Sequence, residues 1–247
     1  MKLSNYLVCV AAVAALSACN SKQENAASNE PLNLTPVAPP KGGDWTQTVS
    51  LTPDGGMLMG NPDAKVKLIE YGSLTCPHCR EFDEKGAEPL MNTYVKSGQV
   101  SWEFRNYVRD AFDLAATLIA RCNGPSGFFP MARALYKDQP NWEGKLQTIP
   151  QPQLEALQTM PSAQIPATAA RLAGLQDWAV ARGLTTTKSA ACLADTNAVN
   201  KLVEMNANAT QQYPDFPGTP TFILNGKLVD KTATWEALEP KLREALR

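Results

Sequence analysis

The sequence has little of what most metal, haem and nucleic-acid sites require. It contains a single histidine, His78, and a single Cys-x-x-Cys pair, Cys76 and Cys79. A structural zinc needs about four ligands, and haem attachment needs a histidine directly after the second cysteine, where this chain has Arg80. A formal net charge of −1 provides no basic field for nucleic acid. We therefore predict no metal centre, no bound cofactor and no nucleic-acid partner.

The chain also lacks an apolar run of the roughly 20 residues that span a membrane. The apolar stretch from Leu7 to Leu16 follows Lys2 and ends in small residues. This is the layout of an export signal that is removed. Cys9 lies inside the apolar stretch and would be removed with it.

The end of that segment, Leu16-Ser-Ala-Cys19, resembles the lipobox of bacterial lipoproteins. The resemblance implies that residues 1–18 are a signal peptide and that Cys19 carries lipid, which tethers a protein to a membrane without spanning it. Asn20 favours the outer membrane over the inner one by the same resemblance. An ordinary cleaved signal with a chance cysteine is the alternative. Residues 19–43, rich in Asn, Ser, Pro and Gly, predict a disordered linker.

Folding signals begin near Trp45. Residues 46–51 and 57–59 are typical of small edge strands, and residues 66–71, VKLIEY, of a buried strand. Met57 and Met59 could together suggest a copper site, but two methionines at strand spacing more often pack in a core.

A helix is predicted to start directly after Cys76. Pro77 suits its first turn, Pro89 predicts a kink, and the segment ends at Ser97-Gly98. The exposed N–H groups and dipole of a helix N-terminus favour a thiolate, and protonated His78 would add a positive charge. Cys79, one turn deeper, could then attack a mixed disulfide formed at Cys76. The spacing predicts an attacking and a resolving thiol, with a permanent structural disulfide as the alternative.

Strand, Cys-Pro-His-Cys and helix together resemble the active site of the DsbA family of thiol-disulfide oxidoreductases. The second family mark is a proline after a cis peptide bond that faces the dithiol, and Thr219-Pro220 matches it. The resemblance implies a substrate-binding role for these two residues. It also implies that Glu70, six residues before Cys76, is buried and assists proton transfer with Cys79; a strand-end residue reaching solvent is the alternative.

The resemblance implies an α/β thioredoxin fold with an inserted helical domain. Residues 44–110 would form its first half, residues 111–208 a mostly helical insertion, and residues 209–247 its second half. The residues themselves predict a strand at 221–224, an Asn-Gly turn and a strand at 227–230. They also predict helices, at 131–136, 153–160, 167–182 and 189–206, and a last one from Thr234 whose apolar stripe is Trp235, Leu238, Leu242 and Leu246.

Cys122 and Cys192 remain, both on apolar helical faces. In an oxidising compartment two leftover cysteines most simply pair. The alternative is two buried free thiols. Spacing along the chain does not decide between them.

These features predict an exported, lipid-anchored oxidoreductase on the periplasmic side of the cell envelope that donates disulfides through Cys76 and Cys79. Its partners would be unfolded or thiol-bearing exported proteins and a membrane protein that restores its redox state. A reductase or isomerase of the same fold is one alternative. A copper-handling or chaperone-like binding protein that uses the dithiol as a ligand is another.

Overall fold

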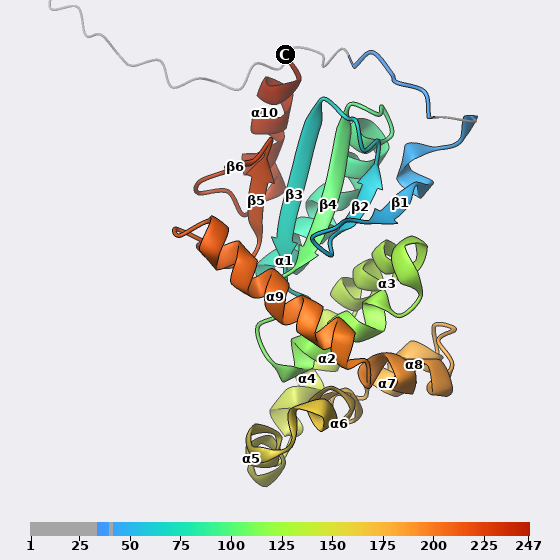
Figure 1. Ribbon diagram of the computed structural model, residues 1–247, viewed down its shortest axis with the longest axis vertical. Coiled ribbons are helices and arrows are strands. Elements are labelled where there is room, and N and C mark those ends of the chain that lie inside the picture. Colours follow the sequence, from blue (N-terminus) through green and yellow to red (C-terminus); the bar gives the residue numbers. More distant parts are fainter. Residues whose placement is uncertain (1–33, 40–41) are drawn as a thin grey trace, which may run out of the picture. The chain divides into compact units, whose positions relative to one another are not determined.

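The computed structural model describes residues 34–39 and 42–247, and a six-stranded sheet lies at the centre of this part (Figure 1). The strand order is β1-β2-β4-β3-β5-β6. Strands β3 and β4 run parallel, and each other neighbouring pair is antiparallel. The strands are Val49–Leu51, Met57–Gly60, Val66–Gly72, Val100–Asn106, Thr221–Leu224 and Lys227–Leu228. The predicted signal peptide, Cys9, Cys19 and residues 20–33 lie outside the described residues.

The predicted strand at 46–51 is shorter in the structure. Residues Trp45–Gln47 form a 3-10 turn, in which the side chain of Asp44 accepts a hydrogen bond from the Thr46 N–H. Strand β1 therefore begins at Val49.

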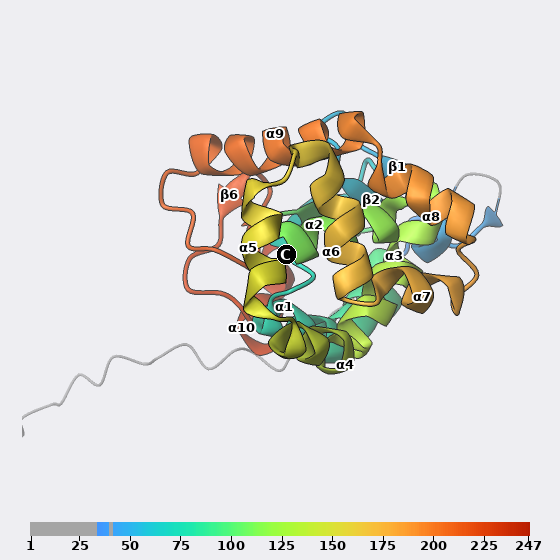
Figure 2. The same cartoon turned by 90° about the horizontal axis from the view of Figure 1, so that it is seen from below.

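The two faces of the sheet pack against different helices. Along β3, Leu68 joins the larger core cluster, which contains Leu238 of α10 (Trp235–Leu246). Tyr71 points to the opposite face and packs with Ala209 of α9 (Thr196–Gln212). Figures 1 and 2 show α9 and α10 on opposite sides of the strands. Because strand side chains alternate between faces, Glu70 shares the face of Leu68.

The helix after Cys76 begins as α1 (Pro77–Phe82) and continues through π-helical turns at Asp83–Ala87 and Leu90–Val95. Pro89, for which we predicted a kink, lies between the two π-helical turns with ordinary helical angles. Proline lacks the N–H of an α-helical bond, and wider turns are one way for a helix to pass it.

Helices fill the chain between β4 and β5, and most gather beyond the C-terminal ends of the parallel strands β3 and β4 (Figure 1). Two segments predicted as single helices are each divided. Gly174, with a φ of 68°, separates α6 (Ile165–Leu172) from α7 (Leu175–Val180). Asp195 caps a new helix, α9, after α8 (Thr186–Leu193). Helix α9 extends beyond residue 208, where we expected the insertion to end. The helices before α9 are α2 Ala111–Arg121, α3 Gly124–Lys137, α4 Gln139–Gly144, α5 Gln151–Thr159, α6 Ile165–Leu172, α7 Leu175–Val180 and α8 Thr186–Leu193.

The last hairpin and helix follow the sequence prediction closely. Asn225 and Gly226 both have positive φ, 49° and 80°, as a tight hairpin turn requires. Strand β6 is shorter than predicted and ends at Leu228. The side chain of Thr234 caps α10, whose buried stripe is Trp235, Leu238 and Leu242. Within the described part of the chain, no helix combines the length and the apolar character needed to cross a membrane.

Candidate active site

Cys76 occupies the N-cap position of α1, as the sequence predicts. Its backbone is extended, with φ −93° and ψ 120°, and Pro77 follows in the first turn. Cys76 is 4% exposed and Cys79 is fully buried. Both are free thiols in this structure. Strand β3 and helix α1 thus hold both cysteines in the interior, with Cys76 slightly less completely buried than Cys79.

Hydrogen bonds favour the charged form of Cys76 and lower its pKa to about 5. The largest contribution is the hydrogen bond from the Cys79 thiol. The side chain of Thr219 and the N–H groups of Cys79 and His78 add to it, whereas burial acts in the opposite direction. As a thiol, Cys76 donates to the Thr219 carbonyl oxygen over 3.1 Å. These donors at a helix start give Cys76 the environment of a nucleophilic thiolate.

The His78 imidazole lies at the surface. Its side chain is 71% exposed, and Nδ1 is 3.9 Å from Oε2 of Glu81. Among the groups that lower the pKa of Cys76, His78 takes part through its backbone N–H. We expected the helix N–H groups and a protonated His78 ring to stabilise the thiolate together; the groups that lower the pKa of Cys76 are Cys79, the Thr219 side chain and the helix N–H groups.

Cys79 has the opposite electrostatic environment. Burial raises its pKa well above the ordinary value, and the neighbouring Cys76 and Glu70 raise it further. The Ser73 N–H, 3.5 Å from Sγ, acts in the opposite direction and lowers the pKa of Cys79. Cys79 is therefore protonated as a free thiol at neutral pH, and a negative charge on it is costly.

Glu70 is buried, with 1% of its surface exposed, so the solvent-facing alternative is wrong. Its Oε2 accepts a hydrogen bond from Trp102 Nε1 over 3.0 Å. Burial raises its pKa well above the ordinary value, and the charge of Asp83 raises it further. Burial also raises the pKa of Asp83 to about 6, against the attraction of Arg133. Burial thus favours the protonated form of Glu70, whose charge would otherwise act directly on Cys79.

Thr219 and Pro220 precede β5, which pairs directly with β3. The peptide bond between them is cis. The Thr219 carbonyl contacts the Cys76 sulfur, and Pro220 is buried. Pairing of β5 with β3 therefore brings Thr219 to the dithiol, although it lies 143 residues after Cys76 in the chain.

Sequence reasoning missed a group of residues that hold the loop before α1. Carbonyl groups of residues 73–76 accept hydrogen bonds from side chains of the helical insertion and from Arg109, which lies just before it. The bonds are Tyr136 Oη to the Ser73 oxygen (3.1 Å), Gln139 Nε2 to the Leu74 and Cys76 oxygens (2.8 and 3.2 Å) and Arg109 Nη1 to the Thr75 oxygen (3.0 Å). No local pattern marks these side chains, because their partners are backbone groups distant in sequence.

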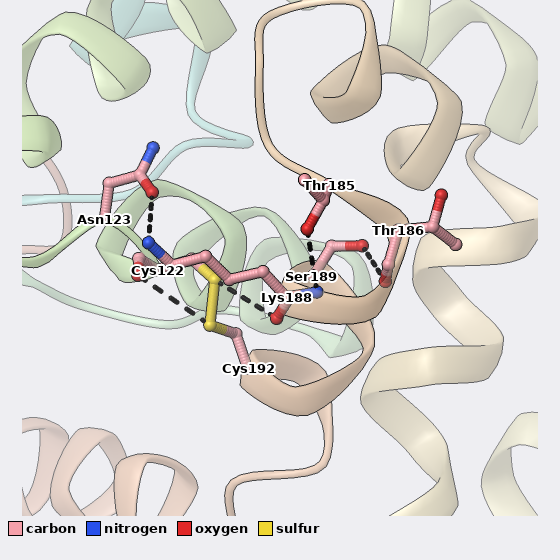
Figure 3. The surroundings of a disulfide bond; sticks show 7 residues. All are labelled: Cys122, Asn123, Thr185, Thr186, Lys188, Ser189 and Cys192. Atoms are coloured by element: carbon pink, nitrogen blue, oxygen red, sulfur yellow. Dashed lines mark hydrogen bonds between the residues drawn. A yellow bond between two sulfur atoms is a disulfide. The ribbon is translucent and has the colours of Figure 1, made fainter.

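Cys122 and Cys192 form a disulfide, with Cα atoms 5.7 Å apart (Figure 3). The bond joins the C-terminal end of α2 to α8. Beside it, Lys188 Nζ donates to Asn123 Oδ1 over 2.8 Å. The pairing is confirmed, and the alternative of two free thiols is wrong.

A family model described as thioredoxin matches residues 52–243 of the chain. The chain belongs to the thioredoxin family. The crystal structure of a protein-disulfide isomerase from Novosphingobium aromaticivorans is 33% identical, with a TM-score of 0.74 over 77% of this chain and 96% of that one. The structure of Wolbachia pipientis alpha-DsbA1 is 20% identical, with a TM-score of 0.60 over 79% and 93% of the two chains. These matches confirm the predicted fold.

One relative in sequence is a Rickettsia bellii protein whose provisional name is protein-disulfide oxidoreductase. It is 26% identical over 176 residues, which cover 70% of this chain and 58% of the relative. This thioredoxin-family chain thus spans little more than half the length of that relative.

Proposed function

We propose that this chain is a thiol-disulfide oxidoreductase that donates disulfides to exported proteins through Cys76 and Cys79. The observation that carries the proposal is the opposite environment of the two sulfurs. The pKa of Cys76 is lowered to about 5 and that of Cys79 is raised. A stabilised thiolate on Cys76 favours the reduced form of the pair and so makes its disulfide a strong oxidant.

The reaction consists of two exchanges. A substrate thiolate attacks Cys76 Sγ of the disulfide, a new sulfur–sulfur bond forms, and the electron pair of the broken bond goes to Cys79. A second substrate thiolate then attacks the substrate sulfur of the mixed disulfide and releases Cys76 as a thiolate. The substrate loses two electrons, and the Cys76–Cys79 pair gains them.

Two further groups are proposed to assist these exchanges. Glu70 is buried, and its raised pKa suits it to give a proton to the Cys79 sulfur as that sulfur leaves. The extended backbone at Thr219 and Pro220 lies beside Cys76 and can hold a substrate segment by strand-like pairing. No bound cofactor is needed, since the disulfide carries the oxidising equivalents.

The proposed site of action is the periplasmic side of a bacterial cell envelope, with a lipid anchor on Cys19 that favours the outer membrane. The support is the sequence of residues 1–20. Labelled palmitate should be incorporated by the natural chain and not by a Cys19→Ser variant. Density-gradient separation of the two membranes then tests the outer-membrane assignment. A membrane redox partner would reoxidise the dithiol.

The direction of exchange is tested by equilibrating the dithiol with glutathione. A disulfide that is much more oxidising than that of thioredoxin supports donation, and a potential near that of thioredoxin contradicts it. The second candidate is an isomerase, because the Novosphingobium relative carries that name. Refolding of a scrambled multi-disulfide protein by the reduced form would favour that candidate.

The copper-handling alternative needs both sulfurs as thiolate ligands. Burial of Cys79 disfavours its thiolate. Titration of the reduced protein with Cu(I) should accordingly give weak binding. Tight stoichiometric binding without oxidase turnover would support the binding protein instead.

A further inference from the structure

Asp113 is a buried carboxylate in the first turn of α2, and the exchange reaction proposed above does not use it. It is fully buried, and its two oxygens accept three hydrogen bonds. The donors are Ser73 Oγ (2.7 Å), the Leu74 N–H (2.9 Å) and the Arg109 N–H (3.0 Å). Two of these donors belong to the loop that precedes Cys76, and the third belongs to the segment that leads into α2.

Ser73 connects this carboxylate to the dithiol. Its hydroxyl donates to Asp113, and its N–H lies 3.5 Å from the sulfur of Cys79. The position of that N–H therefore depends on how Asp113 holds the side chain of Ser73 and the neighbouring Leu74 N–H. Burial raises the pKa of Asp113 to about 7, and the hydrogen bonds from the three donors act against that rise.

We propose that Asp113 is a positioning residue for disulfide exchange, which holds the Ser73 N–H against the Cys79 sulfur as that sulfur becomes a leaving thiolate. When a thiolate attacks Cys76, the bond to Cys79 breaks and its electron pair moves to the fully buried Cys79 sulfur. Preorganised N–H donors are most effective where charge develops in a buried site. The inference rests on the exchange chemistry of the proposed function, and it holds for either direction of electron flow.

An aspartate suits this position better than an amide. Three donors face two oxygens, so an asparagine would present its own N–H₂ to at least one of them. Asp113→Asn nevertheless keeps the size of the side chain. Ser73→Ala removes the hydroxyl that contacts Asp113 and keeps the backbone N–H. Both variants therefore change the same contact from its two sides.

The experiment is a single-turnover reaction of the oxidised protein with excess glutathione. Samples are quenched at intervals, and mass spectrometry measures the protein–glutathione mixed disulfide in which Cys79 is a free thiol. Asp113→Asn and Ser73→Ala should each slow this step roughly tenfold, the effect of weakening one hydrogen bond to a charged group. The double variant should be no slower than the slower single variant, because both act through one contact.

Two controls separate positioning from general loosening. Asp110→Asn removes a charge from the same turn while an asparagine still caps α2, so its rate should equal that of the natural protein. In the reduced variants, the pH midpoint of the Cys76 thiolate absorbance should not change. The groups that lower the pKa of Cys76 are Cys79, Thr219 and His78, and neither Asp113 nor Ser73 is among them. If Asp113→Asn does not fold, Ser73→Ala carries the test alone.

Wild-type rates in folded Asp113→Asn and Ser73→Ala would overturn the inference. A slower step together with a shifted pH midpoint of the Cys76 thiolate absorbance would also overturn it, since the whole loop would then have moved. A natural protein whose disulfide does not exchange with glutathione would contradict the proposed function itself. The failure of the two proposals can therefore be told apart.

Discussion

At the residue scale, two cysteines three positions apart have opposite properties. Cys76 lies at a helix start, where N–H groups lower its pKa to about 5, and Cys79 lies in the core, where burial raises its pKa. The environment of Cys76 follows from local sequence, since Pro77 marks the helix start. The environment of Cys79 depends on tertiary packing, because Glu70 and the Ser73 N–H reach it from the strand and the loop.

The first prediction concerns capture of substrates. Cys79→Ser should accumulate mixed disulfides between Cys76 and exported proteins, because no second thiol remains to resolve them. Non-reducing electrophoresis followed by mass spectrometry measures these species. Cys76→Ser is the matched control and should trap none. Absence of mixed disulfides in Cys79→Ser would count against exchange at Cys76.

The second prediction concerns the groups that stabilise the Cys76 thiolate. Cys79→Ala removes the largest of them and should raise the Cys76 pKa by about one unit or more, whereas Cys79→Ser keeps a donor and should raise it less. Thiolate absorbance against pH measures both. His78→Ala should change the midpoint little, because the ring is exposed and its N–H remains. A large shift in His78→Ala would return the ring to the mechanism.

At the element scale, the helical insertion both covers and holds the active-site loop. Side chains of α2, α3 and α4 and of the segment before α2 donate to or accept from residues 73–76. The sequence predicted a mostly helical insertion but did not predict α4. It could not predict which polar side chains turn toward the loop, because each of these bonds joins elements distant in the chain.

The third prediction concerns the disulfide between α2 and α8. Cys122→Ala with Cys192→Ala should lower the free energy of unfolding by about 4 kcal/mol, the chain-entropy value for a loop of this size; the sequence separation is 70 residues. Urea denaturation measures the change. The single variants should lose as much as the double one, and an unchanged midpoint would show that the bond adds no stability.

At the scale of the whole molecule, the redox state and the stability of the fold are linked through Cys76. Between pH 5 and 9 the unfolded dithiol chain binds a proton that folded Cys76 has lost, given its folded pKa of about 5 and ordinary value of 9.0. The stability of the dithiol form therefore rises with pH across this window. The disulfide form has no such proton, so its stability does not change from this source.

The fourth prediction follows from that linkage. The unfolding free energy of the dithiol form minus that of the disulfide form should rise from pH 5 to pH 9, by at most about 5 kcal/mol. Buried Asp83 and Asp113, with pKa values raised to about 6 and about 7, lower stability as pH rises through that range. Because they do so in both redox forms, their contributions largely cancel in the difference between the two unfolding free energies. Urea titrations at pH 5, 7 and 9 measure the difference, and a constant value would contradict the lowered Cys76 pKa.

The sequence by itself indicated the proposed redox pair, and it determined the helix start beneath that pair and the general course of strands and helices. These follow from short-range rules: proline at a first turn, apolar periodicity and the lack of further metal ligands. Helix divisions at Gly174 and Asp195 were missed, because one glycine or one capping residue is a weak signal inside a long periodic segment.

Only the tertiary structure decided the burial of Glu70, the pairing of Cys122 with Cys192 and the contact of Asp113 with the loop. Each of these depends on the distance between side chains that lie on separate elements. Such distances are set by how the sheet and the helices pack together, and hydrogen bonds and electrostatic interactions then act over those few ångströms.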